Sequence, residues 1–173
     1  MQVVNQNTVN LQGQRQQAIM KKSLERLGVE VELKVIDVNV WFSSDPGNPD
    51  TYAHFYADMQ QTAIGSDLDP QRYMAQFVSW EIAQKANNWA GQNIVRWANA
   101  EYDRLWRQAA TELDPMKRAA LFIRMNDLVI EDVVVIPLSS HPWVSAVSHS
   151  LRGLEVGPWD VATWNLAYWY RET

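Results

Sequence analysis

The chain has 173 residues, of which 47% are hydrophobic, so it can bury the core of one domain, yet no stretch approaches the roughly 20 apolar residues of a membrane span. Its net charge of −5, from 15 basic and 20 acidic residues with no basic block, argues against a nucleic-acid-binding surface. Cysteine is absent, which excludes a disulfide framework, a thiolate metal site and a cysteine nucleophile.

The N-terminal part predicts a strand, a helix and a second strand. Val3 and Val4 begin the first strand, and residues 11–27 follow as a helix that ends at Gly28 in a left-handed cap. Apolar and charged residues then alternate through residues 29–35, as in a half-exposed strand. Such a βαβ unit has a parallel pair of strands and a right-handed crossover. The helix is expected to pack through one apolar side, formed by Ile19, Met20, Leu24 and Leu27.

The middle of the chain is less regular. Residues 40–42 suit a short helix, and residues 43–50 contain only turn formers. Residues 58–64 predict a strand, residues 71–80 a short helix and residues 83–98 irregular structure.

The stretch from residue 100 to residue 138 predicts two amphipathic helices and a buried strand. Its first helix carries an apolar stripe. The second helix begins with Asp114 as its N-cap and Pro115 as its first residue. A β-branched run at residues 133–138 predicts a covered strand, and residues 143–147 suit another. The expected core positions are Tyr102, Leu105, Trp106, Ala109 and Leu113 in the first helix, and Leu121, Phe122, Met125, Leu128 and Val129 in the second.

Six short motifs occur in an order that resembles one protein family. They are GVEVE at 28–32, DLDP at 67–70, NIVRW at 93–97, NAEYD at 99–103, DPMKR at 114–118 and EDVVVIPL at 131–138. Together they resemble the C-terminal lobe of the peptide/nickel-type (family 5) solute-binding proteins of bacterial ABC importers. The resemblance implies an α/β, periplasmic-binding-protein-like (type II) lobe with a mixed central sheet flanked by helices. Residues 1–173 are then expected to form a single domain, one lobe of a larger two-lobe protein whose first lobe and signal peptide lie outside this sequence.

The resemblance also implies the function. A member of this family captures a small solute (oligopeptide, dipeptide, sugar or similar) between its two lobes, and membrane permease subunits recognise the closed form. The partners implied are therefore the solute, the missing N-terminal lobe and the ABC permease, with no nucleic acid. The location implied is extracytoplasmic, in the periplasm or at the outer face of the cell membrane. No enzymatic activity, cofactor or metal is expected.

Five residues are expected to bind the solute. Ser66, Asp67 and Asp69 lie in a loop after a predicted strand, where open α/β sheets place ligands. In peptide-binding relatives a carboxylate of this loop holds the amino group of the ligand, but here Asp67 is displaced by one position. Thr62 and Ala63 stand where relatives often carry a tryptophan, which leaves room for a sugar, an opine or another small solute.

Asn93 and Trp97 complete the expected site, because they match a stretch near the mouth and hinge of the cleft in relatives. An alternative remains open for both residues. Trp97 would then pack under the following helix, and Asn93 would satisfy a turn.

Three other features of the sequence suggest alternative functions. His54 and Asp58, spaced as i and i+4, could share a metal, although a solvated polar pair suits them better because no third ligand is near in sequence. The run Ser139-Ser140-His141 invites a hydrolase, but no G-x-S-x-G elbow accompanies it. Nine tryptophans would suit an α/β domain that binds a protein partner, and a flat apolar patch would favour it, whereas a concave, polar-rimmed pocket favours a solute receptor.

Overall fold

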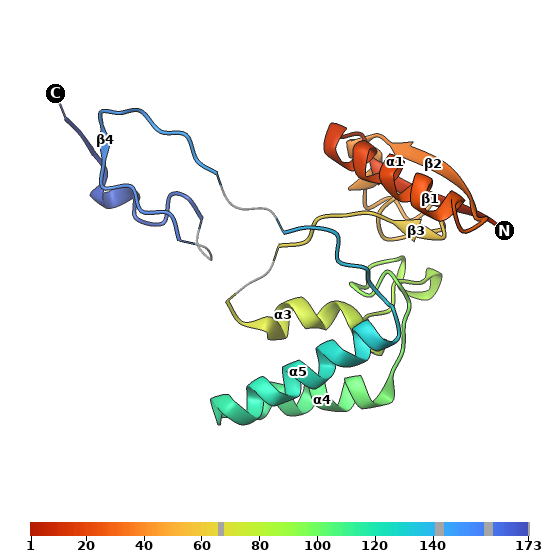
Figure 1. Cartoon of the computed structure of the whole chain (residues 1–173). Coiled ribbons are helices and arrows are strands. Elements are labelled where there is room, and N and C mark those ends of the chain that lie inside the picture. Colours follow the sequence, from red (N-terminus) through yellow and green to blue (C-terminus); the bar gives the residue numbers. More distant parts are fainter. Residues whose placement is uncertain (66–67, 141–143, 158–160, 173) are drawn as a thin grey trace.

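The computed structural model describes residues 1–65, 68–140, 144–157 and 161–172. The chain forms three parts (Figure 1): an α/β part (residues 1–60), a helical part (residues 70–131) and a C-terminal tail (residues 144–172) that extends away from the other two. Two connecting segments, residues 61–65 and 132–140, run between the α/β part and the helical part. Among the described residues, no helix has the length and apolar character needed to cross a bilayer.

The α/β part is built on a parallel sheet. Strand β1 (Gln2–Thr8) lies between β2 (Glu30–Ile36) and the short β3 (Met59–Gln60), and both neighbours are parallel to it. Helix α1 (Leu11–Glu25) connects β1 to β2, and Gly28 ends the turn that follows with a φ of 80°. The predicted βαβ unit and its left-handed glycine are thus confirmed. The sheet of this part is purely parallel rather than mixed, because its strands are joined by long crossovers.

The expected apolar stripe of α1 is present only in part, because Met20 and Leu24 are half-buried and polar side chains complete the face toward the sheet. Ile19 and Leu27 are exposed, whereas Gly13 and Gln17 are the buried residues of α1. The Gln17 side-chain amide donates to the carbonyl oxygens of Asn5, at 2.8 Å, and Lys34, at 3.3 Å. One glutamine therefore ties the helix to both long strands. The same polar layer includes the buried β1 residues Asn5, Gln6 and Asn7.

The helical part contains the principal apolar core. Its elements are α3 (Pro70–Met74), η1 (Ala75–Phe77), η2 (Ser79–Glu81), η3 (Lys85–Asn87), α4 (Ala100–Thr111) and α5 (Pro115–Glu131). Asp114 caps α5 by accepting hydrogen bonds from the amides of Met116 and Lys117, as its sequence position predicts. The buried core consists of Phe77, Val78, Tyr102, Leu105, Ala109, Phe122, Met125, Leu128 and Val129. The predicted stripes are confirmed except at Leu113, which lies beyond the end of α4 and is 95% exposed.

Of the other predicted strands, the one at residues 58–64 forms only in part, and those at residues 133–138 and 143–147 do not form in the described residues. Of residues 58–64, only Met59 and Gln60 pair with a strand. Val133 forms a left-handed turn with a φ of 53°, and residues 134–138 follow it without pairing to a strand. Val134 and Val135 instead pack against the apolar core of the helical part, which explains why this β-branched run reads as buried. Residues 144–147 are also outside any strand, and residue 143 lies outside the described residues.

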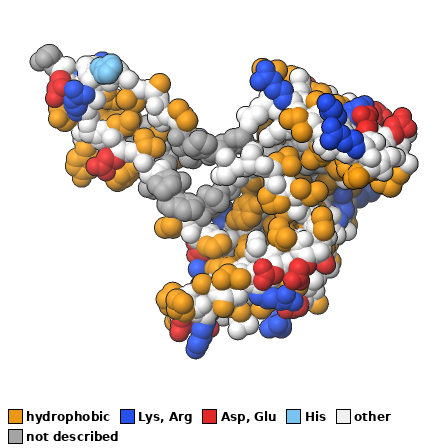
Figure 2. Space-filling view, in the orientation of Figure 1, with side chains coloured by type: hydrophobic (Ala, Val, Ile, Leu, Met, Phe, Trp, Pro, Cys, Tyr) orange, Lys and Arg blue, Asp and Glu red, His pale blue; other side chains and the backbone are white. Residues whose placement is uncertain are grey.

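The tail has a small structure of its own. Strands β4 (Leu151–Arg152) and β5 (Tyr170–Arg171) pair antiparallel, and η4 (Leu166–Tyr168) precedes β5. Asn165 is buried at its centre, where it donates to the Gly153 carbonyl and accepts from the Trp169 indole, both at 2.7 Å. The face of the tail in view in Figure 2 carries many exposed apolar side chains beside charged ones. Among the exposed residues of the tail are Val144, Val161, Trp164, Leu166, Tyr168 and Tyr170.

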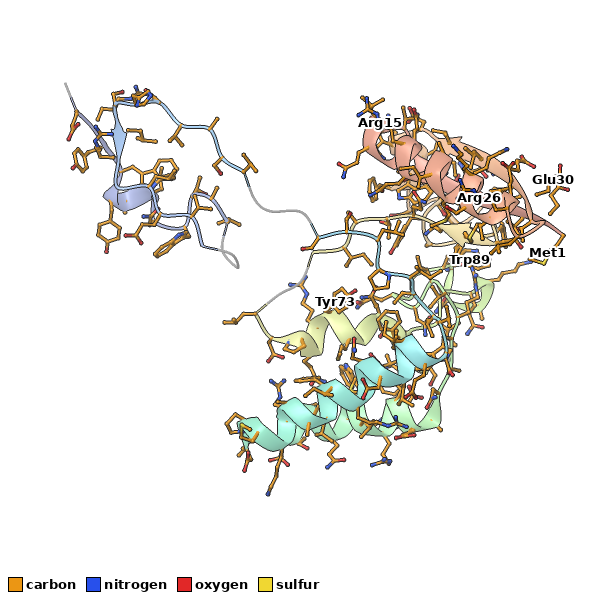
Figure 3. All side chains as sticks on the ribbon, in the orientation of Figure 1. Met1, Arg15, Arg26, Glu30, Tyr73 and Trp89 are labelled. Atoms are coloured by element: carbon orange, nitrogen blue, oxygen red, sulfur yellow. The ribbon has the colours of Figure 1, made fainter. Side chains whose placement is uncertain are left out.

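The α2 helix (Val38–Trp41) begins the long connection from β2 to β3. Trp41 is 1% exposed, so this short helix is anchored in the α/β part by a single large side chain. Residues 42–58 follow as turns and carry the segment that faces the helical part. Figure 3 shows where the two parts approach: Trp89 lies beneath the sheet, and Tyr73 lies on α3.

Candidate functional site

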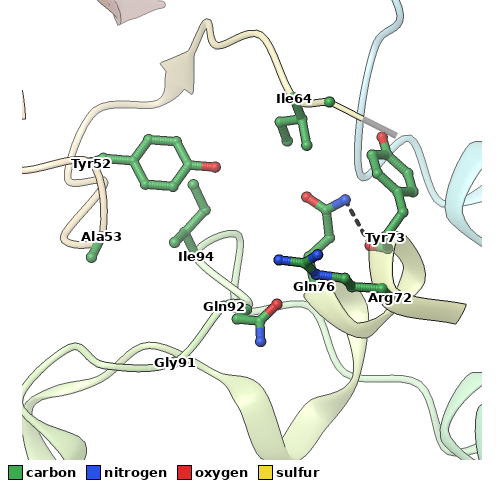
Figure 4. A pocket seen from close by; sticks show the side chains of 10 residues that line it. Tyr52, Ala53, Ile64, Arg72, Tyr73, Gln76, Gly91, Gln92 and Ile94 are labelled. Atoms are coloured by element: carbon green, nitrogen blue, oxygen red, sulfur yellow. Dashed lines mark hydrogen bonds between the residues drawn. The ribbon is translucent and has the colours of Figure 1, made fainter. Parts of the chain in front are cut away.

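A pocket of about 510 Å³ lies where the α/β part and the helical part meet (Figure 4). One wall comes from the β2–β3 connection and the segment after β3, and the other comes from α3, η1 and the loop before α4. The first wall consists of Tyr52, Ala53, Ile64 and Gly65, and the second of Arg72, Tyr73, Gln76, Gly91, Gln92 and Ile94.

Tyr52 is fixed in the first wall by backbone and ring contacts. Its amide donates to the Trp41 carbonyl at 2.8 Å, and its carbonyl accepts from the Gln60 side chain at 3.1 Å. Its ring lies 5.8 Å from that of Trp41. Burial, and secondarily the nearby phenol of Tyr73, raise the pKa of Tyr52 above its ordinary value. The Tyr52 hydroxyl therefore stays neutral at physiological pH and can both donate and accept.

Helix α3 and the turn after it supply polar groups to the second wall. The Gln76 side chain donates to the Tyr73 carbonyl at 2.9 Å, which turns the amide toward the pocket in Figure 4. The Tyr73 ring meets Phe77 edge to face at 6.4 Å. The Tyr102 hydroxyl of α4 donates to the Met74 carbonyl at 2.7 Å, and this bond anchors the end of α3.

The loop before α4 holds Gln92 and Ile94 in the pocket by burying the residue between them. The Asn93 side chain is 0% exposed and donates to the carbonyls of Val78, at 3.0 Å, and Trp97, at 2.8 Å. Its backbone amide donates to the Glu81 carbonyl at 2.8 Å. A Cβ on Gly91 would lie 2.1 Å from that same Glu81 oxygen, so this close approach requires glycine.

The lining combines two phenols, two amides and one guanidinium with the apolar side chains of Ile64 and Ile94. Among the described lining residues there is no carboxylate, thiol or imidazole. Such a surface can hydrogen-bond to a solute and cover its apolar parts. It offers no nucleophile paired with a base.

Of the loop residues predicted to bind a ligand, Ser66 and Asp67 lie outside the described residues. The loop does reach the pocket, because Gly65 lines it. Asp69 is the N-cap of α3 and accepts from the Gln71 amide at 2.9 Å and from the Arg118 guanidinium at 3.0 Å. The hydrogen bond from Arg118 lowers the pKa of Asp69, and the Gln71 amide lowers it further.

Asn93 and Trp97 lie beside the pocket rather than in its lining. The Trp97 indole donates to Asp132 at 2.9 Å, and its ring meets Tyr102 edge to face at 5.2 Å. These are the packing contacts of the alternative interpretation. Contact of either residue with a solute stays a prediction.

The sequence interpretation missed most of the pocket lining. Tyr73 and Gln76 follow the DLDP motif within two helical turns, and Gln92 and Ile94 flank Asn93. Proximity in sequence to the DLDP and NIVRW motifs was therefore the signal that could have identified these pocket residues. Nothing in the sequence placed Tyr52 opposite them, because its approach depends on how the β2–β3 connection turns.

The structure does not support a metal site at His54 and Asp58, and it does not describe the whole of the Ser139-Ser140-His141 run. His54 is buried, with Nδ1 2.6 Å from the Thr51 hydroxyl and Nε2 3.1 Å from the Pro46 carbonyl oxygen. Asp58 accepts from the Val4 amide at 2.7 Å. No group of three His, Cys, Asp or Glu side chains suited to a metal occurs in the described part of the chain. His141, the imidazole of the hydrolase run, lies outside the described residues.

Comparison with known proteins gives consistent similarities. The dipeptide-binding protein DppE of Bacillus subtilis (strain 168) is 28% identical over 138 residues, which are 80% of this chain and 23% of that protein. The oligopeptide-binding protein of Thermus thermophilus, solved with a pentapeptide, is similar with a TM-score of 0.65 and 26% identity, over 77% of this chain and 23% of that one. NikZ of Campylobacter jejuni, solved with Ni(L-His), gives a TM-score of 0.72 at 13% identity, over 98% of this chain and 33% of that one.

No family model matches the chain. The chain spans about a quarter of the length of the first two of these relatives and a third of the third. The structural similarities show that this chain shares the α/β fold of these proteins, and the similarity to NikZ extends over nearly all of this chain.

Proposed function

We propose that this chain, which belongs to the peptide/nickel-type (family 5) extracellular solute-binding proteins, provides one wall of the solute site in the substrate-binding component of an ABC importer. The observation that carries the proposal is the pocket between the α/β part and the helical part, with its polar and apolar lining. The rest of the site belongs to a first lobe that lies outside this sequence.

The proposed mechanism is binding and closure. Both lobes contact the solute only in the closed form, so solute binding shifts the population toward that form, and permease subunits distinguish it from the open form. The function requires no bond to be made or broken. It places the protein outside the cytoplasm, in the periplasm or at the outer face of the cell membrane, where the solute is met.

The solute class follows from the lining and from the relatives. The amides of Gln76 and Gln92 and the phenols of Tyr52 and Tyr73 suit the alternating donors and acceptors of a peptide backbone. Of the relatives, one is a dipeptide-binding protein and another was solved with a pentapeptide. We therefore propose a short peptide, with a sugar or an opine as the alternative left by the departures of the 62–67 loop from the family pattern.

The predicted site residues keep a place in this proposal. Ser66 and Asp67 directly follow the pocket residue Gly65 in sequence and are proposed to contact the solute, with Asp67 as the candidate partner of an amino group. Asp69, Asn93 and Trp97 remain proposed ligand contacts, although each also has a described structural bond. The alternative of a protein-interaction domain is less well supported by a concave pocket with polar groups.

Calorimetry with a dipeptide and a pentapeptide tests the function. The 173-residue chain alone should bind neither more tightly than millimolar, because half of the contacts are missing. In the two-lobe protein, Gln92→Ala or Gln76→Ala should weaken peptide binding by about 1–3 kcal/mol, the usual cost of leaving a buried partner unpaired.

Gln108→Ala is the matched control, because Gln108 is an exposed glutamine on α4 away from the pocket. Micromolar binding of a peptide to the isolated chain would refute the shared site. Equal binding by the two pocket variants and the control would remove the pocket from the proposal.

A further inference from the structure

We propose that Arg96 is a positioning residue that holds the two walls of the pocket at a fixed separation. The inference rests on the proposed function only for its effect on solute affinity. The geometric part concerns this chain alone.

One guanidinium joins backbone groups from both walls. Arg96 Nε donates to the Ala83 carbonyl at 3.0 Å, within the helical part. Its Nη1 donates to the Phe55 carbonyl at 3.3 Å, and its Nη2 donates to the His54 carbonyl. The fork shape of arginine allows these bonds from one planar group, which a lysine cannot reproduce.

The carbonyls that accept these bonds are close in sequence to pocket residues. His54 and Phe55 directly follow Tyr52 and Ala53 of the first wall. On the other side, the Ala83 amide donates to the Asn93 carbonyl at 3.0 Å, between Gln92 and Ile94. Arg96 thus connects the backbone of one wall to the backbone of the other.

The surroundings keep the guanidinium in place. It lies over the Trp89 ring with 5.2 Å between Cζ and the ring centroid. The centroid of the His54 ring lies 4.2 Å from that of Trp89, and Tyr56 meets Trp89 edge to face at 5.7 Å. These contacts come from both parts of the molecule.

Backbone strain gathers at the same place. Phe55, Asn88, Trp89 and Arg96 have φ values of 38°, 53°, 60° and 57°, which are uncommon for residues other than glycine. Each such conformation is unfavourable and persists only where the surroundings fix it. The hydrogen bonds and ring contacts of Arg96 are those surroundings, so loss of the guanidinium should release both loops.

Distance measurement between spin labels tests this clamp. The sequence has no cysteine, so Ser44→Cys and Ala86→Cys introduce the only thiols, at exposed positions on the two sides. Pulsed electron resonance should give a narrow distance distribution for the labelled chain. Arg96→Ala should broaden it, and Arg96→Lys should broaden it as well, because one ammonium cannot replace the fork.

Arg107→Ala is the matched control. The Arg107 guanidinium also lies over a tryptophan, 4.2 Å from the Trp80 ring centroid, but both residues belong to the helical part. The distribution should stay narrow in this variant. If Arg96→Ala fails to fold, as judged by circular dichroism, Arg96→Lys decides the question. A narrow distribution in a folded Arg96 variant overturns the proposal.

The second measurement is pentapeptide affinity of the two-lobe protein. Arg96→Ala should weaken binding roughly tenfold through lost preorganisation, and Arg107→Ala should leave it unchanged. Should the unaltered protein bind no pentapeptide, the proposed function fails and the label distances still decide the role of Arg96. Unchanged affinity together with a broadened distribution overturns the link between the clamp and binding.

Discussion

At the scale of single residues, Asn93 shows how one buried amide shapes the pocket. Its side chain spans the carbonyls of Val78 and Trp97, which belong to segments on either side of the loop before α4. Because the side chain points inward, its neighbours Gln92 and Ile94 line the pocket. The motif that singled out Asn93 in the sequence therefore marks the support of the wall.

Asn93→Ala should lower the free energy of unfolding by about 1–3 kcal/mol, since two carbonyl oxygens lose their donor in a buried place. Urea unfolding followed by circular dichroism measures the change. Gln92→Ala, one residue earlier and exposed, should shift stability by less than about 0.5 kcal/mol. An equal loss of unfolding free energy in the two variants would mean that the Asn93 side-chain hydrogen bonds do not contribute the expected stability.

At the scale of elements, Asp69 connects α3 to α5 through Arg118, at 3.0 Å. The arginine lowers the pKa of Asp69 below its ordinary value of 3.8. A carboxylate with a lowered pKa contributes stability above its ordinary pKa, and this contribution is lost as the pH falls through the folded value. The contribution should be small, because the Asp69 side chain is 55% exposed and solvent screens the pair.

Asp69→Asn should therefore lower the free energy of unfolding at neutral pH by at most about 1 kcal/mol. Below about pH 4 the stability of this variant should fall less steeply than that of the unaltered chain. Asparagine can still cap α3, so the variant removes the charge pair and keeps the helix start. Acid unfolding followed by circular dichroism measures the profile. Asp114→Asn is the control, because Asp114 is also an N-cap with amide partners. An identical change in both variants would assign the effect to capping.

The elements that the sequence predicted best are those with local causes. The cap at Asp114 and the left-handed Gly28 follow from the chemistry of residues within a few positions. The strand expected at residues 133–138 does not form because Val134 and Val135 are half-buried against the helical core without pairing to a strand, and an apolar run alone cannot distinguish these two cases. The apolar stripe predicted for α1 is incomplete for a related reason. Gln17 packs there by bonding to two strands, which no apolar periodicity reveals.

The sequence motifs predicted which segments border the candidate site, but they did not predict which residues face each other across the pocket. DLDP and NIVRW both border the pocket, through Gly65 and through Gln92 and Ile94. Arg96 depends on contacts across about 40 residues of sequence, as in its bond to His54 with a separation of 42. A pattern read along one segment carries no information on such a contact.

At the scale of the whole molecule, the tail is stabilised mainly by bonds within itself, whereas the other two parts are bonded to each other. Its described bonds are largely internal, such as those of Asn165 and the ion pair of Arg152 with Glu172 at 2.7 Å. The connecting segment before it returns to the α/β part, where the Gln16 side chain donates to the Ser139 hydroxyl at 3.3 Å. The α/β part and the helical part share Arg96, the pocket and two connecting segments.

We therefore predict that residues 1–140 unfold as one cooperative unit and that the tail contributes little to their stability. Truncation after Ser140 should leave the midpoint of thermal unfolding within about 2 °C of the full chain, a shift of at most about 1 kcal/mol, because the described bonds of the tail are largely internal. The truncated chain should also bind less of a hydrophobic dye, since Val161, Leu166 and Tyr168 expose apolar surface in the tail. Asn165→Ala is the companion variant, because it disturbs the tail centre and should likewise leave the midpoint in place. A midpoint lowered by more than about 5 °C on truncation would show that the tail supplies part of the common core, and two separate transitions would show that the α/β part and the helical part do not fold together.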